Sequence, residues 1–413
     1  MMDNGAAYSA AIFSPESVPI VGYALDYWEG IVAEWNGFPN QTFMEEHNNI
    51  LRAVKLGLGV ENTRRQALHL ALAAFPLVEK SSLWPVWLPL FEAVYHRFCD
   101  TDRALYGRFL GRLGQLYRLH NRLDEALTVH QEAAAIIAPL PTHSLPACEI
   151  AFQLAEDYRR KFQYDRAKQY ALTAWEAATA ARQSDTWRAA AANSLGLIYE
   201  ALGQPDEAAD WYTVSLGLWR PLQRPVESGR VFNNLGNVLR GQRKMDEALV
   251  AYHQALGHLA GTSIWLEKLV VQYNVAVIYF DQEQYEQAEK NFREAYAALS
   301  RQPDVHFILY ASICYSLGAV IVKQERFAEA EPFFEESINV WRELGDDVSL
   351  ANSLGGLADA LAGQGKADNA RQFYRQALAL LANQRHIPRS EKLYQEFLAA
   401  YTSLNDGVEP VLR

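Results

Sequence analysis

The sequence predicts an all-α solenoid, a fold in which pairs of antiparallel helices are stacked in chain order. One pattern of small and large residues recurs seven times across residues 106–387, and each copy has the periodicity of a helix rather than of a strand. Half of the 413 residues are hydrophobic and 12% are aromatic, which is enough to support a folded core. Because an isolated helix pair cannot bury its apolar face, we expect stacking of the pairs to supply that core.

Each copy of the pattern begins with a Leu-Gly-like pair whose second member is small, so that two helices can approach closely. The seven pairs are Leu113-Gly114, Leu154-Ala155, Leu195-Gly196, Leu235-Gly236, Val275-Ala276, Leu317-Gly318 and Leu357-Ala358. The large residues three positions later are Tyr117, Tyr158, Tyr199, Leu239, Tyr279, Ile321 and Leu361.

The second half of each copy carries an alanine and then, usually, an aromatic residue. The alanines stand twelve positions after the small residues, at Ala126, Ala167, Ala208, Ala248, Ala288, Ala330 and Ala370. Four positions further come His130, Ala171, Tyr212, Tyr252, Phe292, Phe334 and Tyr374. Aromatic rings here are expected to fill the angle between paired helices.

This order of leucine-glycine, tyrosine, alanine and phenylalanine resembles the tetratricopeptide repeat. The resemblance implies a right-handed superhelix of about seven helix pairs, with the first helix of each pair lining a concave groove. The small residues lie 40 to 42 residues apart, whereas the standard repeat has about 34. Such long repeats resemble those of kinesin light chains, spindle-orientation scaffolds, the sensor arms of bacterial signal-transduction ATPases and Gram-positive quorum-sensing receptors. The resemblance therefore implies binding of a protein or peptide.

The helix ends carry their own signals. Glycines are expected to mark turns within pairs at Gly203, Gly241 and Gly363. An acidic residue opens most second helices, where it can accept hydrogen bonds from free N–H groups and suits the positive helix end. These residues are Asp124, Asp165, Asp206, Asp246, Glu286 and Asp368, with Ala328 as the exception.

The pattern divides the chain into four parts: a flexible N-terminus at 1–20, a helical region at 21–105, seven repeats at 106–387, and a capping helix with a tail at 388–413. We expect helices near 22–35, 41–57, 64–78 and 84–98. The last two look like a degenerate repeat, in which Ala67, Leu70, Ala71 and Phe75 face Trp87, Phe91 and Val94. The capping helix places Leu393, Phe397, Ala400 and Tyr401 on one face.

The run from Phe43 to Ala53 resembles the segment that joins the ATPase core of signal-transduction ATPases to their repeat arm. The chain departs from that family because its 413 residues contain no phosphate-binding loop; the run Gly363-Gln364-Gly365-Lys366 lacks the strand and the glycine spacing.

Charge, cysteine content and hydropathy argue against several classes of function, although local basic patches remain possible. The formal net charge of −11 and the isoelectric point near 5.5 disfavour nucleic-acid binding. Cys99, Cys148 and Cys314 are sparse and odd in number, which indicates a reducing compartment without a disulfide framework. The sequence shows no signal peptide and no segment long enough to span a membrane. We therefore expect a cytoplasmic protein.

The ten histidines have no zinc-binding spacing, and no catalytic acid, base or nucleophile stands out. The sequence thus predicts no cofactor, no metal and no enzyme activity.

The first-helix face offers the candidate binding residues. Asparagine presents an acceptor and a donor together and can bracket a peptide bond, and arginine can form forked bonds to carboxylates. The candidates are Arg112, Arg159, Asn193, Arg230, Asn233, Asn234, Asn237, Arg240, Tyr273, Asn274 and Tyr315. The alternative is a polar concave face that is merely solvated.

The leading hypothesis is a non-catalytic scaffold or binding module that holds an extended partner segment in the groove, in signalling or regulation. One alternative is a regulator that resembles quorum-sensing receptors and acts on a signalling protein. Another is a structural adaptor subunit of a larger complex. The sequence leaves the partner and the oligomeric state open.

Overall fold

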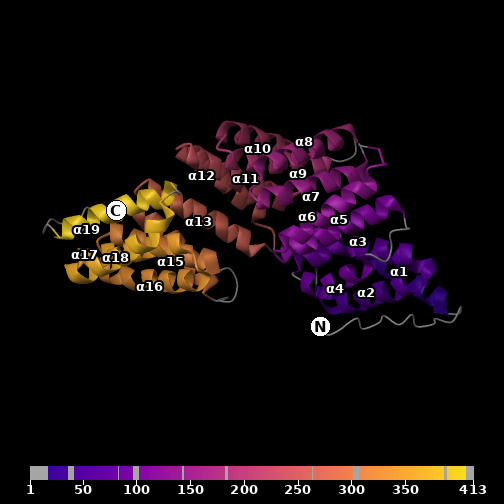
Figure 1. The fold of residues 1–413 in the computed structure, drawn as a ribbon, viewed down its shortest axis with the longest axis horizontal. Coiled ribbons are helices and arrows are strands. Elements are labelled where there is room, and N and C mark those ends of the chain that lie inside the picture. Colours follow the sequence, from indigo (N-terminus) through magenta and orange to yellow (C-terminus); the bar gives the residue numbers. More distant parts are fainter. Residues whose placement is uncertain are drawn as a thin grey trace. The chain divides into compact units, whose positions relative to one another are not determined.

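The computed structural model describes residues 17–35, 41–81, 83–95, 102–141, 144–181, 185–262, 264–300, 307–385 and 388–405. These residues form nineteen α-helices, two short 3₁₀ helices and no strand (Figure 1). The all-α prediction is confirmed. Cys99 and the predicted tail after Asn405 lie outside the described residues, as does the predicted flexible N-terminus up to Glu16; the first helix begins at Ser17.

The chain divides into two compact units, residues 1–223 and 224–413. The boundary falls within the predicted repeat array, between its third and fourth helix pairs. Unit 1 contains α1 (Ser17–Glu34), α2 (Gln41–Gly59), α3 (Arg64–Lys80), α4 (Trp84–Val94), α5 (Arg103–Leu119), α6 (Leu123–Ile137), α7 (Leu145–Arg160), α8 (Tyr164–Ala180), α9 (Asp185–Ala201) and α10 (Pro205–Trp219).

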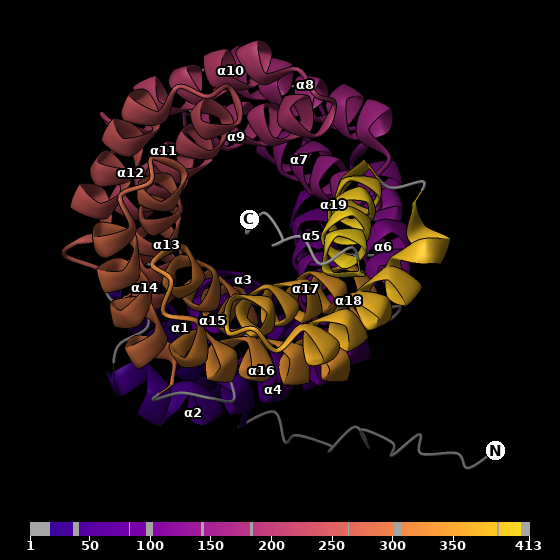
Figure 2. The same cartoon turned by 90° about the vertical axis from the view of Figure 1, so that its left-hand side faces the viewer.

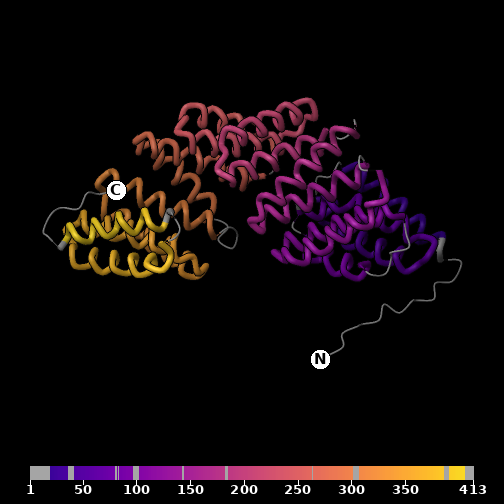
Figure 3. The backbone as a smooth tube through the Cα atoms, turned by 45° about the horizontal axis from the view of Figure 1, so that its top comes forward, coloured from indigo at the N-terminus to yellow at the C-terminus, as the bar shows by residue number. Residues whose placement is uncertain are grey.

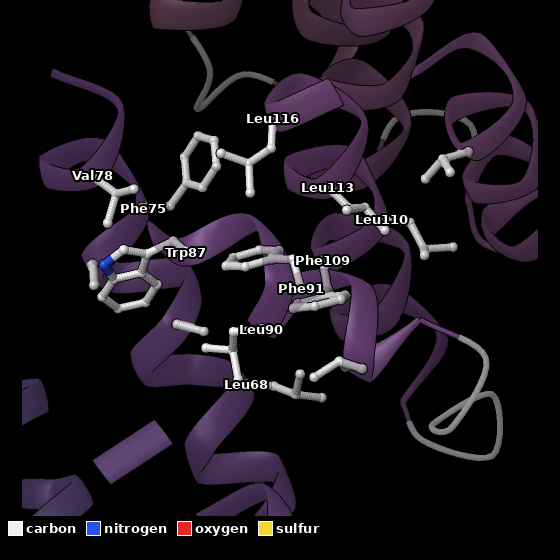
Figure 4. Packing of buried hydrophobic residues seen from close by; sticks show 14 of the residues in the cluster. Leu68, Phe75, Val78, Trp87, Leu90, Phe91, Phe109, Leu110, Leu113 and Leu116 are labelled. Carbon is white, nitrogen blue, oxygen red and sulfur yellow. The ribbon is translucent and has the colours of Figure 1, made fainter. Parts of the chain in front are cut away.

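Aromatic rings join the degenerate pair α3 and α4 to the first regular repeat. Phe75 on α3 packs edge-on against Phe91 on α4, with ring centroids 6.1 Å apart. Phe91 stacks in turn on Phe109 of α5 at 4.6 Å, and Trp87 is fully buried beside them (Figure 4). The predicted contact between Phe75 and Phe91 is therefore present.

Unit 2 contains four helix pairs and a final helix. Its elements are α11 (Pro225–Gly241), α12 (Met245–Leu259), α13 (Trp265–Asp281), α14 (Tyr285–Leu299), α15 (Phe307–Lys323), α16 (Phe327–Leu344), α17 (Asp347–Gly363), α18 (Ala367–Leu381) and α19 (Pro388–Asn405). Within this unit the first helices α13, α15 and α17 form one layer and the second helices α14, α16 and α18 another (Figure 2). Helix α19 packs against α18 (Figure 3) and buries Phe397 and Ala400.

Where the small residue of the repeat is glycine, it lies directly against a side chain of the second helix. A methyl group on Gly236 would lie 2.5 Å from the Tyr252 ring, and one on Gly318 would lie 2.7 Å from the Phe334 ring. Since such distances are far shorter than van der Waals contact, the glycine is what permits the aromatic ring of the second helix to be buried.

The turns within the seven pairs repeat one backbone geometry. Each contains one residue with a positive φ, namely Asn121, Phe162, Gly203, Arg243, Glu283, Glu325 or Gly365. The following N–H bonds to the carbonyl five residues earlier, as Lys366 does to Leu361 at 2.9 Å, which is the Schellman arrangement.

The predicted turn glycines are correct in one case and wrong in two. Gly203 is the left-handed residue of its turn, with φ of 72°. Gly241 and Gly363 are instead the last residues of α11 and α17. The left-handed residues of those turns are Arg243 and Gly365, two positions later.

The prediction that an acidic residue opens most second helices is confirmed, but these residues do not occupy the N-cap position. The residues that precede the second helices make no side-chain capping bond; they are Arg122, Gln163, Gln204, Lys244, Gln284, Arg326 and Lys366. The acidic residues lie inside the first turn, as Asp246 does in α12. Their carboxylates can therefore act on the helix dipole but do not cap the helix.

Candidate functional site

In unit 1, the predicted binding residues Arg112 and Arg159 are engaged with side chains of the same unit. The guanidinium of Arg112 lies over the Phe75 ring at 5.1 Å and donates a 3.1 Å hydrogen bond to Gln115. Arg159 pairs with Glu156 at 2.7 Å. Asn193 is half-buried on α9. Arg112 also lies 3.9 Å from Glu149, so the charge of each arginine is partly offset before any ligand binds.

The carboxylate of Glu156 accepts hydrogen bonds from Arg159 and from Ser194. Burial alone would raise its pKa, but the charge of Arg159 and hydrogen bonds from Arg159 and Ser194 lower the pKa overall. Ser194 donates its hydroxyl to Glu156 at 2.6 Å. The carboxylate is therefore held in its charged form by the fold.

A buried polar network, which sequence reasoning missed, joins α5, α6 and α7. Arg118 donates to Asp157 at 2.8 Å, and Asp157 also contacts Nδ1 of His130. Nε2 of the same ring lies 3.0 Å from the Gly111 carbonyl oxygen. Both ring nitrogens therefore lie beside oxygen atoms of the protein. The signal in the sequence was the histidine itself, which stands in a column of mostly aromatic residues.

In unit 2, the predicted asparagines bond to one another and to the repeat framework. Asn274 on α13 donates to Asn233 on α11 at 2.8 Å and to Asn237 at 3.3 Å. Asn237 also accepts a 2.7 Å hydrogen bond from the buried Tyr252. Asn234 lies half-buried beside Asn233 on the same helix. The structure thus brings the asparagines of α11 and α13 together.

The two predicted arginines of α11 differ in their surroundings. Arg230 is exposed and donates from Nε to Glu267 at 2.9 Å. Arg240 lies near the end of the helix, where its charge acts on Asp281. Burial raises the pKa of Asp281, and the nearby charges of Arg240 and Arg243 oppose that shift.

A cavity of about 760 Å³ opens on the first-helix face of unit 2, between α13, α15 and α17. Of the eleven predicted residues, Tyr273 and Tyr315 line it and the others do not. The Tyr273 hydroxyl lies 3.2 Å from the Ser316 hydroxyl, and Tyr315 donates to Asn352 at 3.3 Å.

Together with the asparagine bonds, these contacts form a ladder of polar side chains across successive first helices. We call the residues of the cross-helix bonds the polar ladder: Asn233, Asn237, Tyr273, Asn274, Tyr315, Ser316 and Asn352.

The floor of the cavity is apolar. It includes the buried rings of Phe292, Phe334, Trp341 and Phe397. Space above this floor exists because small residues occupy the lining positions of α15 and α17, among them Ser312, Ser316, Ala319, Ser353 and Gly356. Small side chains on the inner face were the sequence signal for the cavity, but a hollow is a property of the neighbouring helices as well.

Charged groups lie at both ends of the cavity. Asp346, at one end, accepts a 3.0 Å hydrogen bond from the backbone N–H of Ser349 and so caps α17. The other end carries Asp281, Lys323 and Asp359. Asp359 is 6% exposed and accepts a 2.5 Å hydrogen bond from Tyr374.

No group of three or more histidine, cysteine, aspartate or glutamate side chains in the described residues could hold a metal ion. Among the described helices, none combines the length and the apolar character that crossing a membrane requires.

Comparison with known proteins identifies the repeats. Residues 191–224, 227–302 and 310–383 match family models described as tetratricopeptide repeat. These segments of the chain are therefore tetratricopeptide repeats, as the residue pattern predicts.

One curated relative is the transcriptional activator NprA of Geobacillus stearothermophilus, which is 23% identical over 229 residues, or 52% of this chain. The match covers 54% of NprA, so the chain spans about half the length of the curated relative it matches.

Two solved structures share the fold at 15% identity. The apo form of the quorum sensor NprR from B. thuringiensis superposes with a TM-score of 0.59, covering 88% of this chain and 99% of that one. A signal-transduction ATPase of the STAND class with a tetratricopeptide repeat sensor, from Pyrococcus horikoshii, superposes with a TM-score of 0.60 and covers 87% of this chain and 55% of its own.

Proposed function

We propose that this chain of tetratricopeptide repeats is a non-catalytic binding module that holds an extended peptide or partner segment against the first helices of unit 2. The cavity between α13, α15 and α17 carries this proposal. Its volume of about 760 Å³ lies in the usual range for a ligand site, roughly 300–1,000 Å³.

The lining suits a peptide because it combines an apolar floor with polar walls. Buried rings such as Phe334 and Phe397 can receive an apolar side chain. Hydroxyl and amide groups of Ser316 and Asn352 stand at the walls, where they can exchange their present bonds for bonds to a ligand backbone.

The asparagines of α11 and α13 extend this face beyond the cavity. Because the Asn274 amide donates to the Asn233 carbonyl oxygen, a ligand that bonds to either of these two groups competes with an existing hydrogen bond. We propose that they bind ligand backbone with small net gain and that Tyr273 and Tyr315 supply more of the affinity. Arg230, which is paired with Glu267, contributes in the same limited way.

Filling the cavity tests the proposal. Ser312 lines the cavity and is half-buried, so Ser312→Trp should occupy it. The probe is a library of short fluorescein-labelled peptides, and binding is followed by fluorescence anisotropy. We expect the variant to lose binding. Val250→Trp adds the same side chain at a position of α12 that is 62% exposed and should bind as the wild type does. Unchanged binding by Ser312→Trp would overturn the proposal.

The likeness of fold to the quorum sensor NprR supports a second candidate, a regulator that acts on another signalling protein. This function would require turnover of, or stable association with, a phosphorylated partner. A phosphatase assay on phosphorylated response regulators tests it, with the Ser312→Trp variant as a control for dependence on the cavity.

A further inference from the structure

The lining of the cavity in unit 2 is acidic on balance. Of the described residues that line it, three are aspartates, Asp281, Asp346 and Asp359, and one is a lysine, Lys323. A cavity with an apolar, low-dielectric floor and one prevailing sign of charge concentrates the electric field on a ligand of opposite sign. The balance therefore favours a cationic ligand group.

The three carboxylates are not equally available. Asp346 is occupied with the cap of α17, and Asp359 is nearly buried against Tyr374. Asp281, the last residue of α13, is exposed and lies at the same end as Lys323. It is thus the carboxylate most open to a ligand.

Two positive charges lie near Asp281 without forming an ion pair with it: Arg240 at the end of α11 and Arg243 in the turn that follows. Partial burial raises the pKa of Asp281, and these two charges offset only part of that shift. No ion pair joins Asp281 to any cation in the part of the chain that the structure describes. The charged form of a partly buried carboxylate without an ion-pair partner is stabilised by a cation placed beside it.

Two tyrosine rings provide the rest of a site for such a cation. Tyr273 and Tyr315 line the cavity from adjacent first helices, α13 and α15. Aromatic faces attract a guanidinium or ammonium group, and they also pack against the methylene shaft of a lysine or arginine side chain.

We propose that the cavity selects a basic side chain, lysine or arginine, of the bound peptide. The shaft packs against Tyr273 and Tyr315 above the apolar floor, and the charged head pairs with Asp281. Lys323, at the same end of the cavity, opposes this pairing by charge repulsion. This assignment rests on the proposed function, because it names the ligand chemistry of the same site.

A positional-scanning library tests the assignment. Three pools of short peptides, acetylated and amidated, are identical except for one central residue fixed as arginine, glutamine or glutamate. We expect the arginine pool to bind wild-type protein about tenfold more tightly than the glutamine pool, and the glutamate pool to bind least.

Charge variants test whether Asp281 and Lys323 determine the preference for arginine. Asp281→Asn should bring the arginine pool to the affinity of the glutamine pool and leave the glutamine pool unchanged. Lys323→Gln should increase the affinity for the arginine pool. Asp210→Asn removes the same charge from an exposed position on α10 in unit 1 and should preserve the preference. Circular dichroism of each variant verifies that helix content is retained.

The outcomes separate this inference from the proposed function. Equal binding of the three pools would overturn the inference and leave peptide binding intact. The same holds if the glutamate pool binds most tightly and Lys323→Gln abolishes that binding. A preference for arginine that persists in Asp281→Asn would also overturn it. Absence of binding by all pools would count against the proposed function as well.

Discussion

His130 shows how one residue can reorganise a repeat. At the equivalent position the other repeats carry tyrosine, phenylalanine or alanine, and the ring packs against the small residue of the first helix. In the first repeat the imidazole occupies that space beside Gly114. Its polar edges also bind Asp157 and the Gly111 carbonyl, so a packing position has become part of a buried charge network.

We expect His130→Phe to destabilise unit 1 by about 1–3 kcal/mol, because Asp157 and a carbonyl each lose a buried partner. Urea unfolding followed by circular dichroism measures the effect. A double-mutant cycle with Asp157→Asn isolates the interaction. Additive losses in that cycle would mean that the two side chains are not coupled, contrary to the network described here.

Glu156 should make the stability of unit 1 sensitive to acid. Its folded-state pKa is lowered, so its contribution is fully present above the usual glutamate pKa and is lost as the pH falls through the folded value. We expect Glu156→Gln to flatten the decline of the urea midpoint between neutral and acidic pH. An unchanged acid limb in this variant would show that other carboxylates govern the decline.

The candidate site could be predicted from the sequence only in part. The helical face is evident from the spacing of its residues, and Tyr273 and Tyr315 are among the residues that the sequence predicts for it. The asparagines are predicted because each offers a donor and an acceptor together, but in the structure the Asn274 amide donates to Asn233 across helices. Cross-helix pairing and the hollow left by Ser316 and Gly356 depend on two helices at once, which a single segment of sequence does not report.

At the scale of the helix hairpin, the turns combine one backbone conformation with different residues. Glu325 adopts φ of 60° and Gly365 φ of 77° at equivalent positions. A residue with a side chain is strained in this region, whereas glycine is not.

Exchanging residues at these turns should therefore shift stability in opposite directions. We expect Glu325→Gly to stabilise unit 2 by about 0.5–1 kcal/mol and Gly365→Ala to destabilise it by about 1 kcal/mol. A methyl group on Gly365 meets no atom within 4 Å, so its cost is conformational. Denaturant unfolding of both variants checks the pair. If both variants were as stable as the wild type, the strain of the left-handed residue would have to be relieved elsewhere.

The fold was predictable because the small and aromatic columns encode contacts within a single hairpin. The details at the hairpin ends were not. In the sequence, an aspartate such as Asp246 looks the same whether it is the N-cap or a first-turn residue. Its actual position depends on where the left-handed residue before it lies. That residue is glycine in only two of the seven turns, so its position could not be located from composition.

On the scale of the molecule, the cavity and every residue that lines it belong to unit 2. Repeat arrays are stabilised mainly by contacts between neighbouring repeats. We therefore expect a fragment of residues 224–413 to fold and to bind the arginine peptide pool as the full chain does. Circular dichroism and fluorescence anisotropy test this. A folded fragment without binding would show that the binding face requires residues of unit 1.

The recurrence of one turn geometry bears on how the gene could change in length. Lys244 and Gln284 follow equivalent left-handed residues and have nearly the same backbone angles, φ −87° and ψ 67° against φ −86° and ψ 65°. Unequal recombination between their codons would delete or duplicate residues 244–283. The new junction would keep the backbone dihedral angles and the turn hydrogen bond that each of the two turns already has. Descendants of such a gene could therefore lengthen or shorten their ligand-facing surface by whole hairpins without inventing a new loop.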